Sequence, residues 1–113
     1  MINKIYFTAI ILTLASSAFA GDKIRGQDLV KQKNCASCHG ADFISTVSPE
    51  YPKLAGQKED YLYNSMLSYQ SKDIYFGRNN ALMQGQMKDI PAKDLKDIAS
   101  YLSSLKGDLV MKK

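Results

Sequence analysis

Both cysteines and the only histidine of this 113-residue chain lie within five consecutive residues, Cys35-Ala36-Ser37-Cys38-His39. Two cysteines form at most one disulfide, so the fold cannot depend on a disulfide framework. The spacing C-x-x-C-H is the signature of covalent haem attachment. Residues three apart lie on the same side of a short helix, where two thiols can form thioethers with the two vinyl groups of one porphyrin. His39 can then turn its ring toward the iron as an axial ligand.

Other uses of this motif explain it less well. A thiol–disulfide redox pair has the same C-x-x-C spacing, but the βαβ pattern that normally surrounds it is missing from the sequence. A zinc site needs four ligands, so a carboxylate would have to complete the set. A structural disulfide suits an exported protein but gives His39 no role. We therefore favour haem attachment at Cys35 and Cys38, with His39 on the iron.

The first 20 residues have the features of an export signal. Lys4 supplies a positive charge, Ile5–Leu14 is mostly apolar, and Ala18-Phe19-Ala20 has the small-x-small pattern of a cleavage site. The apolar stretch is shorter than the roughly 20 residues of a membrane span, although an uncleaved N-terminal anchor is an alternative. We predict cleavage after Ala20, one mature domain at residues 21–113, a periplasmic location and no stable membrane insertion.

The formal net charge of +4 is mildly basic. The lysines are spread along the chain and do not form the clustered basic stripe of a nucleic-acid-binding protein. The sequence therefore predicts no nucleic-acid partner. A weakly positive face would steer the protein toward acidic patches on partner proteins, or it serves solubility alone.

Three segments have the hydrophobic spacing of helices, residues 25–33, 58–71 and 91–105. The segments between them, residues 41–57 and 72–90, are predicted to be long loops, which are unusual in a small domain unless they bind something. So few helices enclose a small core, and a large apolar cofactor would complete it. The residues expected to face inward are Ile24, Leu29 and Val30, then Tyr61, Leu62, Ser65, Met66 and Tyr69, and finally Leu95, Ile98, Ala99, Leu102 and Leu105.

A haem bound by one histidine needs a ligand on the other face of its iron, and methionine sulfur is a known axial ligand. The mature chain offers Met66, Met83, Met87 and Met111. Met66 is predicted to lie in the core, and Met111 lies in the tail. Met83 and Met87, in the predicted loop before the last helix, are the better candidates, and spacing alone does not separate them.

Several aromatic residues are candidates to pack around the porphyrin. For any single one of them, ordinary core or surface filling is the better interpretation. The set is Tyr51, Tyr61, Tyr63, Tyr69, Tyr75, Phe76 and Tyr101.

Four stretches of the chain resemble the class I c-type cytochromes, especially the small bacterial periplasmic monohaem kind. The resemblance implies an all-α fold in which three main helices and long loops surround one covalently bound haem c, with the first and last helices crossing. The stretches are CASCHG at residues 35–40, YPKLAGQ at residues 51–57 with Tyr61-Leu62, RNNALM at residues 78–83 and DIASYL at residues 97–102.

Carried over residue by residue, the resemblance implies roles for two further positions. The backbone carbonyl of Pro52 would accept the second ring N–H of His39 and orient that ligand. Met83 would be the distal ligand in preference to Met87, because its distance from Ile90, just before the last helix, matches the family.

Iron with His39 and Met83 on its two faces has no free position for oxygen or substrate, so the predicted function is electron transfer and not catalysis. We predict a monomer that shuttles one electron at a time between respiratory-chain partners, such as a cytochrome reductase, an oxidase or a dehydrogenase. The alternative is a haem-bearing subunit permanently bound to one dehydrogenase or oxidase. A haem enzyme or gas sensor would need an open sixth position, and a thiol oxidoreductase would contain no haem.

Overall fold

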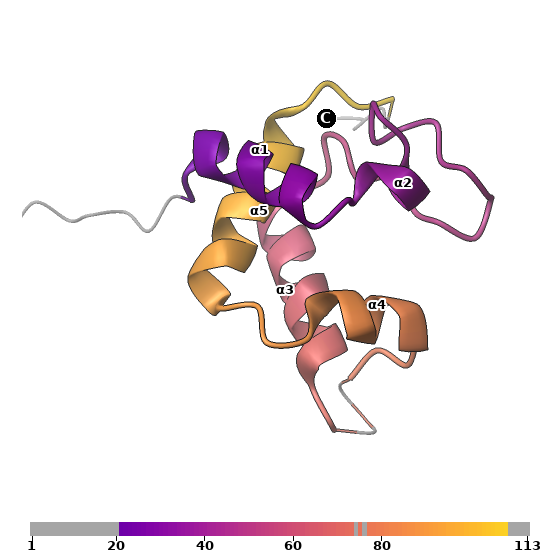
Figure 1. Ribbon diagram of the computed structural model, residues 1–113, viewed down its shortest axis with the longest axis vertical. Helices are drawn as coiled ribbons and strands as arrows, with labels where there is room; N and C mark the ends of the chain where they lie inside the picture. The colour runs from indigo at the N-terminus through magenta and orange to yellow at the C-terminus, as the bar shows by residue number, and fades with distance from the viewer. Residues whose placement is uncertain (1–20, 74, 76, 109–113) are drawn as a thin grey trace, which may run out of the picture.

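The computed structural model describes residues 21–73, 75 and 77–108, which form five helices and no strand (Figure 1). The predicted signal peptide and Met111 lie outside the described residues. Within the described residues, no helix has the length and apolar character needed to cross a membrane. The all-α prediction is confirmed. In chain order the helices are α1 (Lys23–Gln32), α2 (Ala36–His39), α3 (Glu59–Gln70), α4 (Ala81–Met87) and α5 (Ala92–Ser104).

Helices α1 and α5 cross and pack against each other (Figure 1). Gly26 lies at the crossing, where a Cβ atom would overlap the carbonyl oxygen of Asp97. Leu29 and Val30 are buried, as predicted, but Ile24 is 77% exposed and its predicted inward orientation is wrong. Gly26, Leu29 and Val30 share the inner face at helical spacing, which leaves Ile24 on the opposite side of α1.

The start of α1 is set by Asp22, which the periodicity did not reveal. Its carboxylate accepts hydrogen bonds from the backbone N–H groups of Ile24 and Arg25, both at 3.0 Å. These bonds satisfy two of the donors that a helix N-terminus leaves free. The helix therefore begins at Lys23, two residues before the predicted start at Arg25.

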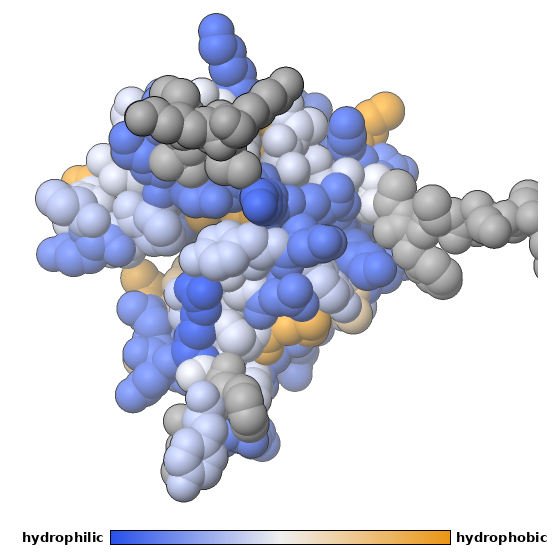
Figure 2. Space-filling model, turned by 180° about the vertical axis from the view of Figure 1, so that it is seen from behind, coloured by the Kyte–Doolittle hydropathy of each residue, from blue (hydrophilic) through white to orange (hydrophobic). Residues whose placement is uncertain are grey.

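The core lies where α3 and α5 meet beneath α1. Four of the five inward positions predicted on the last helix, Leu95, Ile98, Ala99 and Leu102, are at most 2% exposed, and Leu105 is partly buried against the same cluster. Helix α3 adds Leu62 and Met66, and the loop before it adds Phe43 and Ala55. Several large hydrophobic residues are exposed, among them Ile24, Val47 and Tyr75, and the face drawn in Figure 2 shows only small separate apolar patches.

Helix α4 is a correction to the predicted long loop over residues 72–90. Asn80 begins it, because its side-chain oxygen accepts the backbone N–H of Met83 at 3.0 Å. The helix has seven residues with Gly85 inside it, and such a short, glycine-containing segment carries little helical signal of its own. Packing against α3 supplies the remaining stabilisation. Met83 and Met87 therefore lie on a helix and not on a loop.

Candidate haem site

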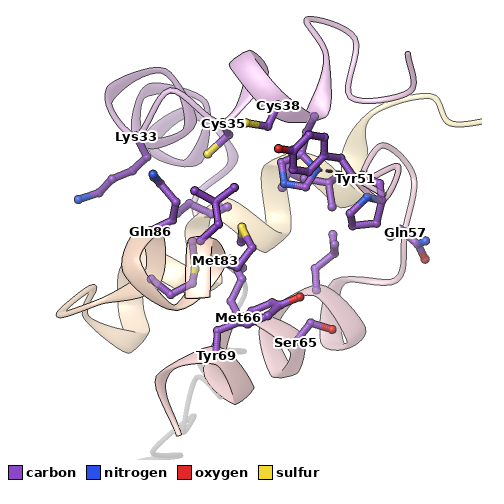
Figure 3. Close-up of a pocket in the computed structure, with 18 of the residues that line it drawn as sticks. Lys33, Cys35, Cys38, Tyr51, Gln57, Ser65, Met66, Tyr69, Met83 and Gln86 are labelled. Atoms are coloured by element: carbon purple, nitrogen blue, oxygen red, sulfur yellow. Dashed lines mark hydrogen bonds between the residues drawn. The ribbon is translucent and has the colours of Figure 1, made fainter. Parts of the chain in front are cut away.

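An apolar cavity opens between the loop that follows α2 and helices α3 and α4 (Figure 3). It opens to solvent on one side, and together with that open mouth it encloses about 1140 Å³ of empty space. The predicted long loop of residues 41–57 does cover the cofactor side, since Tyr51–Leu54 and Gln57 line the cavity. All the residues predicted to bind or orient haem also line it: Cys35, Cys38, His39, Pro52, Met83 and Met87.

The two cysteines lie side by side at one edge of the cavity (Figure 3). Cys35 is the N-cap of α2 and Cys38 lies on it, so the three-residue spacing places both on one side of a helical turn. The two cysteines are not joined by a disulfide in this structure. Burial raises the pKa of the Cys35 thiol and disfavours the thiolate that a thiol–disulfide exchange enzyme uses.

The zinc alternative lacks its ligands. Among the described residues, no group of three or more histidine, cysteine, aspartate and glutamate side chains could hold a metal ion. A zinc site would need such a cluster around Cys35 and Cys38.

His39 is 6% exposed and lies at the end of α2. Its Nδ1 atom is 2.9 Å from the carbonyl oxygen of Pro52. A carbonyl can only accept, so Nδ1 carries a proton and donates it, and in the neutral ring Nε2 is then the nitrogen with a lone pair. The Tyr51 ring contacts the imidazole edge to face, with 6.1 Å between ring centroids. Gly40 follows at φ 87°, a conformation that suits glycine.

Methionines approach the cavity from two helices. Met83 and Met87, four residues apart, lie on one face of α4, and Met66 comes from α3. Met87 is 4% exposed and belongs to the buried core, whereas Met83 is only partly buried. Met66 is 8% exposed, which agrees with its predicted core position, although it also lines the cavity.

Polar groups gather across the cavity from the cysteines, where Figure 3 shows Ser65 and Tyr69. The Arg78 guanidinium lies 5.6 Å and 5.7 Å from the ring centroids of Tyr61 and Tyr69. Its hydrogen bond to Tyr61, at 3.4 Å, lowers the pKa of that phenol. The hydroxyl oxygen of Ser65 is buried without a hydrogen-bond partner.

The aromatic predictions are mixed, and two site residues were missed. Tyr51, Tyr61 and Tyr69 line the cavity, whereas Tyr63 and Tyr101 are not among its lining residues. Tyr75 is 85% exposed, and Phe76 lies outside the described residues. The sequence assigned no role to Arg78 or Asn80, although both fall in the RNNALM stretch that carried the resemblance.

An all-helical domain whose C-x-x-C-H motif borders an apolar cavity defines a c-type haem protein. Residues 24–106 match the cytochrome c family, and the chain belongs to that family. The match confirms the predicted fold and the covalently bound haem c, which the spacing of Cys35 and Cys38 implies. The cytochromes of this family are electron carriers.

Individual relatives share this domain. The chain is 39% identical over 113 residues to cytochrome c4 from Pseudomonas aeruginosa, covering 96% of this chain and 52% of that protein. It is 39% identical over 85 residues to cytochrome c-554(548) from Halomonas halodenitrificans, covering 75% and 98%. The crystal structure of reduced recombinant cytochrome c4 from Pseudomonas stutzeri is similar with a TM-score of 0.69 and 37% identity, over 80% of this chain and 48% of that one. The chain thus spans about half the length of its cytochrome c4 relatives.

Proposed function

We propose that this chain carries one electron at a time on a single haem c whose iron is bound by His39 and Met83. One arrangement carries the proposal: two thiols and a buried imidazole border one side of an apolar cavity, and a methionine-bearing helix borders the other. Haem supplies an iron that changes oxidation state by one electron. The protein supplies the two attachment points, both axial ligands and a dry surrounding.

His39 is suited to be the proximal ligand because of its hydrogen bond. The contact between Nδ1 and the Pro52 carbonyl fixes the tautomer and the ring orientation. Nε2 is then the nitrogen with a lone pair to donate. A hydrogen bond of this kind also raises the basicity of the ligand.

Met83 is the better distal ligand on α4. Both side chains border the cavity, but Met83 is only partly buried, whereas Met87 is packed among the buried core residues. Asn80 anchors the backbone of Met83 directly, through the 3.0 Å bond to its N–H. A thioether ligand raises the reduction potential. With sulfur on one face and imidazole on the other, no position is open for substrate.

The end of the cavity across from the cysteines suits the acidic propionate groups of haem. Arg78 offers a positive charge, and the Tyr61 and Ser65 hydroxyls can donate hydrogen bonds. Pairing carboxylates with a guanidinium offsets the cost of removing them from water. We propose that these three residues hold the propionates.

We further propose that residues 1–20 are an export signal and that the protein works in the periplasm. We also propose that it is a monomer that meets its redox partners transiently. The face drawn in Figure 2 has no broad apolar patch of the sort that permanent interfaces use. The mildly positive charge favours partners with acidic docking patches.

Absorption spectroscopy and mass spectrometry test this function, on protein secreted by a host that attaches haem c. We expect a mass increase of one haem, a low-spin spectrum, an iron–sulfur charge-transfer band in the oxidised state and no carbon monoxide binding at neutral pH. Rapid carbon monoxide binding would overturn the electron-carrier function in favour of a gas sensor or enzyme. Constant co-purification with one dehydrogenase or oxidase would replace the shuttle with a bound subunit.

A further inference from the structure

We infer that Gln70 is a positioning residue for the methionine ligand, because its side chain holds the C-terminal end of α4. This inference rests on the proposed ligation of the iron by a methionine of that helix. Gln70 is the last residue of α3, and its amide reaches across to the segment that joins α4 to α5.

The amide makes two short hydrogen bonds. Its Nε2 atom donates to the backbone carbonyl of Met87 at 2.7 Å and to that of Ile90 at 2.8 Å. Both acceptors are carbonyls, so only the NH₂ side of the amide can serve them, and both of its hydrogens are used. One side chain of α3 therefore ties together the last residue of α4 and the residue just before Pro91.

The chain at this point depends on such support. A helix leaves its last carbonyls without partners, and α4 is too short to be stable alone. Beyond it, Lys88 leaves the helical conformation with φ −55° and ψ 129°, and Asp89 has φ 59°, a left-handed conformation that costs free energy in a residue other than glycine. Asn80 fixes the other end through its bond to the Met83 N–H. The two polar side chains thus hold α4 at both ends.

Holding α4 also holds its methionine sulfur against the iron. Without the Gln70 bonds, the helix would move away from α3 more often, and the iron–sulfur bond would open more often. A small external ligand binds only while that bond is open, so its apparent affinity reports the fraction of open molecules. Losing these two part-buried hydrogen bonds should raise the fraction of open molecules about tenfold.

The inference is tested by titrating the oxidised holoprotein with imidazole. The loss of the iron–sulfur band measures how much imidazole has bound. Gln70→Glu keeps the side-chain shape but has no N–H to donate at neutral pH. Gln70→Leu removes the polar amide group altogether. Both should lower the apparent dissociation constant for imidazole about tenfold. If the leucine variant does not fold, the glutamate variant can still be measured, because Gln70 is only partly buried and a charge is tolerated there better than in the core.

Asp22→Ala is the matched control, because it weakens the protein at the start of α1, far along the chain from α4. It should lower thermal stability and leave imidazole affinity within about twofold of the original protein. An intact iron–sulfur band with unchanged imidazole affinity in both Gln70 variants would overturn the positioning role alone. A holoprotein that has no iron–sulfur band at the outset would overturn the proposed methionine ligation and, with it, this inference.

Discussion

The backbone of Gly26 in α1 lies directly against the carbonyl group of Asp97 in α5, with no room between them for a side chain. Gly26→Ala should therefore push the two helices apart and lower the free energy of unfolding by about 2–3 kcal/mol. Urea unfolding of the holoprotein, followed by circular dichroism, measures this loss. A variant as stable as the original protein would show that the crossing is looser than described.

Gly85→Ala is the control for the helix crossing, because it makes the same chemical change inside α4. Apart from its chain neighbours and the backbone of α4 itself, no atom of the described residues lies within 4 Å of the added Cβ, and alanine is the better helix former. This variant should gain up to about 1 kcal/mol. If Gly26→Ala lowers the free energy of unfolding and Gly85→Ala raises it, the loss at Gly26 comes from close packing and not from helix propensity.

The protein should lose stability at low pH because the carboxylate of Asp97 becomes protonated. Burial alone would raise its pKa, but hydrogen bonds from the Asp22 N–H at 2.8 Å and the Arg25 guanidinium at 2.6 Å outweigh burial and lower the pKa. Because the pKa of Asp97 is lower in the folded state, the ionised carboxylate stabilises the fold at pH values above its unfolded-state pKa of about 3.9. That stabilisation is lost as the pH falls through the folded-state pKa. Asp97→Asn should cost about 1–3 kcal/mol at neutral pH and weaken the acid dependence of the melting temperature below about pH 4.

Asp108 provides the matched comparison for Asp97. It forms an equally short ion pair with Lys53, 2.6 Å, but both side chains are nearly half exposed. Exposed pairs contribute little, so Asp108→Asn should change stability by less than about 0.5 kcal/mol. Equal losses of stability in Asp97→Asn and Asp108→Asn would contradict the argument that burial makes the Asp97 interactions stronger.

Much of this site was readable from local sequence patterns. The C-x-x-C-H motif needs only one helical turn to act, and the stripe on α5 repeats at the helical period, so both were recognised. The same reasoning placed Leu29 and Val30 inside but also placed Ile24 there, because three apolar residues near a helix start do not define a face. The contact between Gly26 and α5 determines which face of α1 is buried. Because α5 is distant in the sequence, this contact adds nothing to the local hydrophobic pattern.

Helix α4 shows what local patterns miss. Its existence depends on Asn80, on the amide of Gln70 and on packing against α3, none of which adds hydrophobic periodicity to residues 72–90. Arg78 was overlooked for a similar reason. An arginine in a polar stretch looks solvated until the fold brings two tyrosine rings to its guanidinium.

The two methionines of α4 should respond differently to truncation. Met83→Ala should abolish the iron–sulfur band, lower the reduction potential and admit carbon monoxide, because it removes the proposed distal ligand. Met87→Ala should keep the band but lose about 2–4 kcal/mol of stability, since Met87 is 4% exposed in the core. Spectroscopy and redox titration of both variants measure the difference, and the opposite pattern would make Met87 the ligand.

Removing both attachment points should largely prevent folding. The cavity between α2, α3 and α4 is lined mainly by apolar groups. Leaving it unfilled removes packing from the core residues that border it, Leu62, Met66, Ile98 and Leu102. The Cys35→Ala, Cys38→Ala double variant should therefore lose the helical circular dichroism signal and the cooperative thermal transition. Ser37→Ala changes the same motif at an exposed side chain whose hydroxyl bonds the Asn34 carbonyl, and it should keep haem and fold normally. A helical, cooperatively unfolding double variant without haem would mean that the α1–α5 crossing and its core are sufficient for the fold, and that the cofactor fills a cavity already formed.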